Sequence, residues 1–134
     1  MINVLEDKDY TADRLDGYKQ ALQQSGLAYD PSLVFYTVNS VEGGESIAAE
    51  LIQNREISAV FCATDTIAIG VASKLKMLGY SIPEDFSLVG YDGLGHQMLA
   101  KPQLTTIHQP IYNLGMMLAE SLLERLNGRT KIIK

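Results

Sequence analysis

Residues 58–110 of the chain read SAVFCATDTIAIGVASKLKMLGYSIPEDFSLVGYDGLGHQMLAKPQLTTIHQP. Two apolar segments, 59–63 and 87–91, are each followed by a turn that carries an acidic residue. The segment between them repeats apolar residues at helical spacing, so the pattern predicts a strand, a helix and a second strand. In an open parallel sheet, the turns at the carboxyl ends of the strands form the ligand site. The stretch therefore indicates a binding crevice, and it contains no obvious catalyst.

The same alternation continues toward the N-terminus. Apolar segments at 1–5 and 33–38 predict two further strands, and helical spacing predicts helices over 11–26 and from Gly43-Gly44 onward. Residues 59–63 are apolar at every position, as expected for a strand that helices cover on both faces. Because strands alternate with helices of this length in βαβ units, the chain is predicted to be α/β, with a three-layer α/β/α open parallel sheet.

The pattern changes near the C-terminus. Residues 104–109 are predicted to be extended, and Pro110 can start a helix because its missing amide hydrogen would be unpaired there in any case. The helix predicted over 111–126 has an apolar arc too wide for one packing surface, so we expect it to touch something besides the sheet. The last residues, 130–134, resemble the start of a strand, and the chain is interpreted as a fragment.

Composition narrows the class of protein. A length of 134 residues suits one domain or a large part of one, and a net charge of -5 with dispersed basic residues predicts weak nucleic-acid binding by the chain itself. No apolar run approaches the ~20 residues that span a bilayer, and the N-terminus lacks a signal-peptide pattern. The single cysteine, Cys62, lies in an apolar run and is expected to be buried and inert. These features predict a cytoplasmic protein without a membrane partner.

Polar side chains follow the predicted strands at their carboxyl ends. The candidate ligand contacts, with Arg14 of the first helix nearby, are Asn39, Thr64, Asp65 and Asp92, and Glu6 and Asp7 follow the first strand. Because hydroxyl groups both donate and accept hydrogen bonds, this lining suits a neutral polyol. Acids at strand ends also cap helices. Thr64 or Asp65 can cap the helix that follows them, and for Asp65 a cap is favoured over a ligand contact. For Asp92 both interpretations stay open.

Several enzyme signatures are missing from the sequence. It has no G-x-S-x-G elbow, no phosphate-binding G-x-x-x-x-G-K-[ST] loop and no H-E-x-x-H zinc motif. His96 and His108 are isolated in sequence, which favours surface or structural roles over a metal site. The chain is therefore predicted not to be an enzyme, with no catalytic residue, metal or cofactor.

A phosphorylation receiver domain is one alternative. The opening Val4-Leu5-Glu6-Asp7 and the later Lys101-Pro102 are similar to receiver motifs, and Asp65 could stand at the acceptor position. However, Lys101 does not follow a convincing apolar strand, and the run that begins at Thr64 continues directly into a helix. The receiver interpretation is therefore disfavoured.

An ordered set of motifs runs through essentially the whole chain. The motifs are Arg14-x-x-Gly17-Tyr18, Ala59-Val60-Phe61-Cys62-Ala63-Thr64-Asp65, Ala68-x-Gly70, Gly79 with Ile82-Pro83-x-Asp85, Val89-Gly90-Tyr91-Asp92 and Leu104-Thr105-Thr106-Ile107-x-Gln109-Pro110. In order and spacing they resemble the effector-binding core of the lactose/galactose-repressor (LacI/GalR) family of bacterial transcription regulators. Each motif alone is weak, whereas the ordered set is specific.

The resemblance implies a periplasmic-binding-protein-like (type I) core of two α/β lobes with an effector, usually a sugar, between them. Residues 1–106 would form most of the C-terminal lobe, and residues 107–134 the crossover and a helix of the other lobe. The family's effector-contacting arginine and aspartate match Arg14 and Asp92. Thr64 stands where the family often has an effector-contacting asparagine, and Asn39 falls near another contact region by spacing.

The resemblance also implies partners. Operator DNA would be bound by an N-terminal domain that these residues do not contain, and the regulator would be a homodimer. The expected effector is a sugar or sugar phosphate, and it is expected to be of the disaccharide type because the Ala-Thr-Asp-Thr and Gly-Tyr-Asp-Gly variants resemble regulators of disaccharide use. A transport-type sugar-binding protein with the same lobe is the main rival, and the missing signal peptide counts against it.

Overall fold

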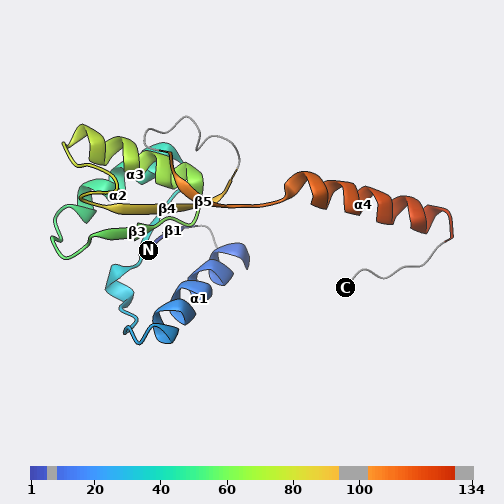
Figure 1. Ribbon diagram of the computed structural model, residues 1–134, viewed down its shortest axis with the longest axis horizontal. Helices are drawn as coiled ribbons and strands as arrows, with labels where there is room; N and C mark the ends of the chain where they lie inside the picture. Colours follow the sequence, from blue (N-terminus) through green and yellow to red (C-terminus); the bar gives the residue numbers. More distant parts are fainter. Residues whose placement is uncertain (6–8, 94–102, 129–134) are drawn as a thin grey trace.

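Strands and helices alternate along the chain, as the sequence predicts (Figure 1). The computed structural model describes residues 1–5, 9–93 and 103–128. Its elements are β1 (Ile2–Val4), α1 (Asp9–Gln24), the 3-10 helix η1 (Pro31–Leu33), β2 (Phe35–Thr37), α2 (Val41–Leu51), β3 (Ala59–Phe61), α3 (Asp65–Met77), β4 (Ser87–Asp92), β5 (Thr105–His108) and α4 (Ile111–Leu126).

The described strands form a parallel sheet. β1 pairs with β2, β3 with β4, and β4 with β5, all in parallel. A bridge between Ile2 and Cys62 joins the two groups of strands, and the Ala63 amide donates to the Ile2 carbonyl over 2.8 Å. The order across the sheet is therefore β2-β1-β3-β4-β5, and the carboxyl ends of these strands lie along one edge.

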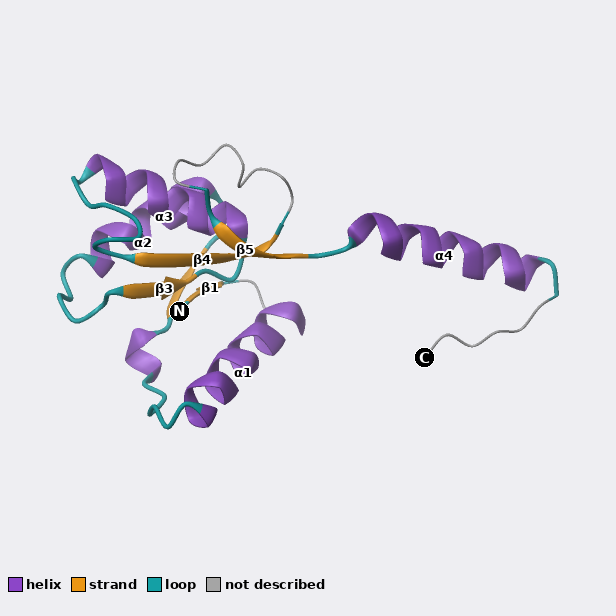
Figure 2. Ribbon diagram, viewed as in Figure 1, coloured by secondary structure: helices purple, strands orange, loops and turns teal. Residues whose placement is uncertain are grey.

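Helices lie on both faces of this sheet, which confirms the three-layer α/β/α prediction. α2 and α3 pack side by side on one face, and α1 lies on the other (Figure 2). The largest fully buried side chains are Ile2, Leu51, Ile67, Leu75, Val71 and Cys62. Burying an aliphatic side chain of this size stabilises a fold by about 1.5–3 kcal/mol, so this layer of side chains is a main source of stability.

One prediction about the sheet is wrong, because β3 is not covered on both faces. Val60 is buried, whereas Ala59 is exposed and Phe61 is only half-buried. In β4 the exposed Val89 repeats this alternation. The reason is the position of α1, which contacts β1 and reaches β3 through Tyr18, whose ring centroid lies 6.4 Å from that of Phe61. The α1 side of β3 and β4 is therefore partly open.

The start of α2 also differs from its prediction. The helix begins at Val41, two residues before Gly43, because the Ser40 hydroxyl accepts a hydrogen bond from the Gly43 amide at 3.0 Å and caps the first turn. The predicted stops at Gly26 and Gly79 are confirmed by their φ angles of 71° and 87°. Such positive angles suit glycine after the last turn of a helix.

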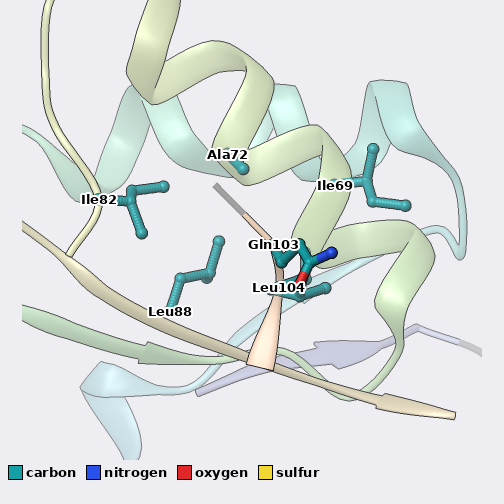
Figure 3. Close-up of a pocket in the computed structure, with 7 residues that line it drawn as sticks. Ile69, Ala72, Ile82, Leu88, Gln103 and Leu104 are labelled. Atoms are coloured by element: carbon teal, nitrogen blue, oxygen red, sulfur yellow. The ribbon is translucent and has the colours of Figure 1, made fainter. Parts of the chain in front are cut away.

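A small apolar pocket lies between α3 and the point where the chain enters β5 (Figure 3). Its lining residues are Ala68, Ile69, Ala72, Ile82, Leu88, Gln103 and Leu104. The volume, about 20 Å³, matches a single water molecule, and the lining offers a water few polar partners. We regard this pocket as imperfect packing rather than a binding site.

Helix α4 extends away from the rest of the structure (Figure 1). None of its residues is buried, and its exposed apolar side chains include Ile111, Leu114, Met116, Met117, Leu118, Leu122, Leu123 and Leu126. The strand that leads to it, β5, pairs with β4 as far as His108. The division of the chain into a lobe of residues 1–106 and a crossover with a helix of another lobe stays a prediction.

We expect the 134-residue chain to self-associate through α4, because large exposed apolar patches rarely stay uncovered in water. Sedimentation velocity should show a species larger than the monomer as the concentration rises. Leu118→Glu, at a side chain 72% exposed, should shift the distribution to monomer without lowering the thermal midpoint of the lobe. Glu120→Gln on the same helix is the matched control. A chain that stays monomeric up to millimolar concentration contradicts this expectation.

Candidate functional site

The strand ends bring Arg14 and Asp92 together. Arg14 lies in the second turn of α1, and Asp92 is the last residue of β4. The Arg14 Nη2 atom lies 3.1 Å from the Asp92 Oδ1 atom, and the two side chains are only 12% and 17% exposed. The pair thus places a donor and an acceptor side by side at the carboxyl edge of the sheet, where the sequence predicted a binding crevice.

Aromatic rings and a carbonyl fix the Arg14 guanidinium group. Its carbon atom lies 4.8 Å from the centroid of the Tyr10 ring and 4.1 Å from that of Tyr91. The Nη1 atom donates to the carbonyl oxygen of Ala63, two residues after β3. Cation–π contacts and a charge-assisted hydrogen bond hold the planar group in one orientation. Arg14 is therefore preorganised to donate hydrogen bonds.

The Asp92 carboxylate is the meeting point of two donors. Its Oδ1 atom accepts from Arg14 and also from the Gln109 side-chain amide, at 2.7 Å. Burial raises the pKa of this carboxyl above its ordinary value, and this effect outweighs the neighbouring Arg14 and Gln109, which lower the pKa. A carboxyl with a raised pKa makes the fold less stable as the pH rises through its titration. Asp92 is thus held in place at some cost to the fold.

Thr64 and Asn39 form a second polar pair at the same edge. The Thr64 hydroxyl donates to the Asn39 Oδ1 atom at 2.7 Å and accepts from the Ile67 amide at 3.3 Å. Thr64, one of the two predicted cap candidates, is therefore the N-cap of α3, and the interpretation of Asp65 as a cap is wrong. Because Thr64 is only 3% exposed and its hydroxyl serves two partners, exposed Asn39 is the more accessible member of the pair.

Asp65 is buried beneath the Arg14–Asp92 pair. It is 3% exposed, its Oδ2 atom accepts from the Gly93 amide, and its Oδ1 atom accepts from the Thr106 hydroxyl. Both carboxylate oxygens are occupied within the protein. In this arrangement Asp65 supports the turn that follows β4, and a direct contact between Asp65 and a ligand stays a prediction.

Sequence reasoning missed Tyr10, Tyr91 and Gln109 as members of the site. Tyr91 and Gln109 belonged to the motifs that carry the family resemblance, but without an assigned role. The parallel register pairs Asp92 with His108, which places the next residue, Gln109, beside the carboxylate. The register of β4 and β5 cannot be predicted without the order of the strands in the sheet. The contact of the Tyr10 ring with Arg14 cannot be predicted without the orientation of α1. Only the position of Tyr91 next to Asp92 was a usable signal.

The remaining candidate groups make structural contacts, are buried or lie outside the described residues. Cys62 is 0% exposed, which confirms its predicted burial, and this burial raises the pKa of the thiol; its inertness stays a prediction. The His108 Nδ1 atom lies 2.9 Å from the Gly93 carbonyl, a structural contact. Glu6, Asp7 and His96 lie outside the described residues. Within the described ranges, no cluster of side chains could hold a metal ion, and no helix is long and apolar enough to cross a membrane.

Thr64→Ala should lower the free energy of unfolding by about 1 kcal/mol, because α3 loses its side-chain cap. Chemical denaturation followed by circular dichroism measures the change. Thr64→Ser is the matched control, since serine keeps the capping hydroxyl and removes only a methyl group. Equal stability of the alanine variant and the native chain would show that the cap contributes nothing.

A model of the periplasmic binding protein-like domain family matches residues 2–134. The chain belongs to this family. The ribose operon repressor of Haemophilus influenzae is 36% identical in an alignment of 133 positions that covers 95% of this chain and 40% of the relative. The chain therefore spans well under half the length of this relative. The periplasmic binding protein-like domain occurs here in its LacI-family form, which confirms the resemblance drawn from the motifs.

Solved structures of LacI-family regulators share the domain. A regulator from Enterococcus faecium with bound ribose superposes with a TM-score of 0.84 at 35% identity, covering 94% of this chain and 47% of that one. A complex of the regulator CelR with cellobiose gives a TM-score of 0.81 at 30% identity, over 97% of this chain and 41% of that one. The homologues are transcriptional repressors rather than enzymes, in agreement with the prediction from the sequence.

Proposed function

We propose that the carboxyl edge of this sheet is the effector-binding wall of a LacI-family transcriptional regulator, and that the effector is a sugar. The Arg14–Asp92 pair is the observation that carries the proposal. A guanidinium group donates and a carboxylate accepts, so together they match vicinal hydroxyls, each of which can do both. Sugars are bound by the Enterococcus faecium regulator and by CelR, which supports this ligand class.

The accessible polar groups define the specificity of the wall. Asn39 lies beyond Thr64, so it can contact a second ring of a disaccharide, the sugar type that the sequence motifs favour. The rings of Tyr91 and Tyr10 lie against the Arg14 guanidinium group. We propose a neutral disaccharide over a sugar phosphate, because Arg14 is already neutralised by Asp92 and a phosphate would meet that carboxylate.

The sugar would act by favouring one arrangement of two lobes, which requires unequal affinity for the two arrangements. The second lobe, the operator-binding domain and a homodimeric assembly in the cytoplasm are part of the proposal for the full-length regulator. Because this chain supplies only one wall, we expect the chain alone to bind sugar weakly. A transport-type binding protein is the rival, and the repressor names of the relatives favour regulation over transport.

The test is a DNA-binding assay on a full-length regulator that contains this chain. A DNA fragment is first selected from a random library, and its binding is then measured with and without a panel of pentoses, hexoses, disaccharides and their phosphates. We expect at least one neutral disaccharide to change the affinity for DNA about tenfold or more, the lower end of typical allosteric coupling. If every sugar and sugar phosphate leaves DNA binding unchanged, the sensor proposal is wrong.

A further inference from the structure

The peptide group between Asp92 and Gly93 is held from both ends. Its carbonyl oxygen, from Asp92, accepts a hydrogen bond from the backbone N–H of Gln109 at 3.0 Å. Its N–H, from Gly93, donates to the Asp65 Oδ2 atom at 2.9 Å. Asp92 has a φ angle of 130°, a backbone conformation that residues other than glycine rarely adopt. Such a conformation persists only when its surroundings impose it.

The Asp65 side chain is one of the groups that hold Asp92 in this conformation. It is 3% exposed, and its second oxygen, Oδ1, accepts from the Thr106 hydroxyl at 2.6 Å. A buried carboxylate is costly unless hydrogen bonds satisfy it, so its presence calls for a role. Capping of α3 is not that role, because Thr64 supplies the cap.

The backbone of β4 is shaped to admit this carboxylate. A Cβ atom on Gly90 would lie 2.3 Å from the Asp65 Oδ1 atom, closer than real contacts allow. A side chain at position 90 would therefore push Asp65 away from the Gly93 amide. The glycine of the Val-Gly-Tyr-Asp motif thus makes room for Asp65 directly beneath the turn that carries Asp92.

We propose that Asp65 is a positioning residue that aims the Asp92 carboxylate at Arg14 and Gln109. It fixes the N–H side of the Asp92–Gly93 peptide group, and through Thr106 it ties that peptide to β5, the strand that leads out of the lobe. The importance of this alignment for sugar binding rests on the proposed function. The alignment itself is a property of the 134-residue chain.

The test uses nitrogen-15 NMR spectra of the native chain and its variants without sugar. Asp65→Ala removes both acceptors, so amide exchange at Gly93 should become at least about tenfold faster relative to the β1 amides. The Gln109 side-chain NH2 signals should shift as Asp92 moves. Asp65→Asn should restore protection, because its Oδ1 atom can accept from Gly93 while its NH2 group donates to Thr106. Thr106→Val, which keeps the Gly93 bond, should leave Gly93 protected even if Asp65→Ala fails to fold.

Val71→Ala is the control for stability. Val71 is a fully buried residue of the same helix, and its apolar side chain cannot hydrogen-bond to the turn after β4. It should destabilise the lobe and leave the Gly93 and Gln109 signals as in the native chain. Native Gly93 protection in Asp65→Ala overturns the proposal, as do equal changes in Val71→Ala, or lost protection in Thr106→Val. Neither readout involves sugar, so a regulator that ignores every sugar leaves this test intact.

Discussion

Asp92→Ala in a full-length regulator that contains this chain is expected to lower its sugar affinity about 100-fold, or about 2.7 kcal/mol. The variant removes the acceptor for a sugar hydroxyl and also leaves the Arg14 guanidinium without its carboxylate. Unsatisfied buried groups make such losses larger than those from removing apolar contacts. Isothermal titration calorimetry with the sugar found in the DNA-binding assay measures the effect.

Two variants control this experiment. Asp92→Asn keeps an oxygen that can accept from Arg14 and Gln109, and we expect it to fold well because burial already disfavours the charged carboxyl. Its affinity loss should be smaller than that of the alanine variant. Asp16→Ala removes an exposed acid on the same helix as Arg14, one that pairs with Lys19 at 3.1 Å. If Asp16→Ala and Asp92→Ala lose affinity equally, the effect is not specific to the site.

Gly70→Ala should destabilise the lobe by about 3 kcal/mol or more, because α2 and α3 touch backbone to backbone at this residue. A Cβ atom on Gly70 would lie 2.0 Å from the Val41 carbonyl oxygen, and one on Gly44 would lie 2.2 Å from the Ile67 carbonyl oxygen. Neither backbone atom can move without separating the two helices. Urea unfolding followed by circular dichroism measures the loss.

Gly17→Ala is the matched control for Gly70→Ala. Gly17 lies inside α1, and a Cβ atom there would meet no atom within 4 Å. Since alanine favours helix over glycine, this variant should gain about 0.5–1 kcal/mol. A Gly70→Ala variant as stable as Gly17→Ala would show that α2 and α3 can separate freely, contrary to the packing described here.

The order of strands and helices could be predicted because it depends on local apolar spacing. The predicted helix over 111–126 coincides with α4, and the alternation from β1 to β4 appears where expected. The covering of β3 could not be predicted from its apolar sequence, because a run such as Ala59-Val60-Phe61 is equally compatible with one covered face or two. Only the placement of α1 decides between them.

The candidate site was predictable only in part, because its contacts depend on how distant elements are placed. Arg14 and Asp92 were proposed from their positions in the motifs, and the structure places them 3.1 Å apart, although their contact with a ligand stays a prediction. The role of Asp65 could not be read from the sequence, since Thr64 and Asp65 are both good caps. The structure assigns the cap to Thr64 because the Asp65 carboxylate is engaged by the Gly93 amide after β4 and by the Thr106 hydroxyl.

A crystal structure of a full-length regulator that contains this chain, bound to its sugar, tests the central claim most directly. We expect sugar hydroxyls within hydrogen-bond distance of Arg14 and Asp92, with Asp65 buried and still bonded to the Gly93 amide. A sugar bound away from the carboxyl edge of the sheet, with Arg14 and Asp92 untouched, would contradict it.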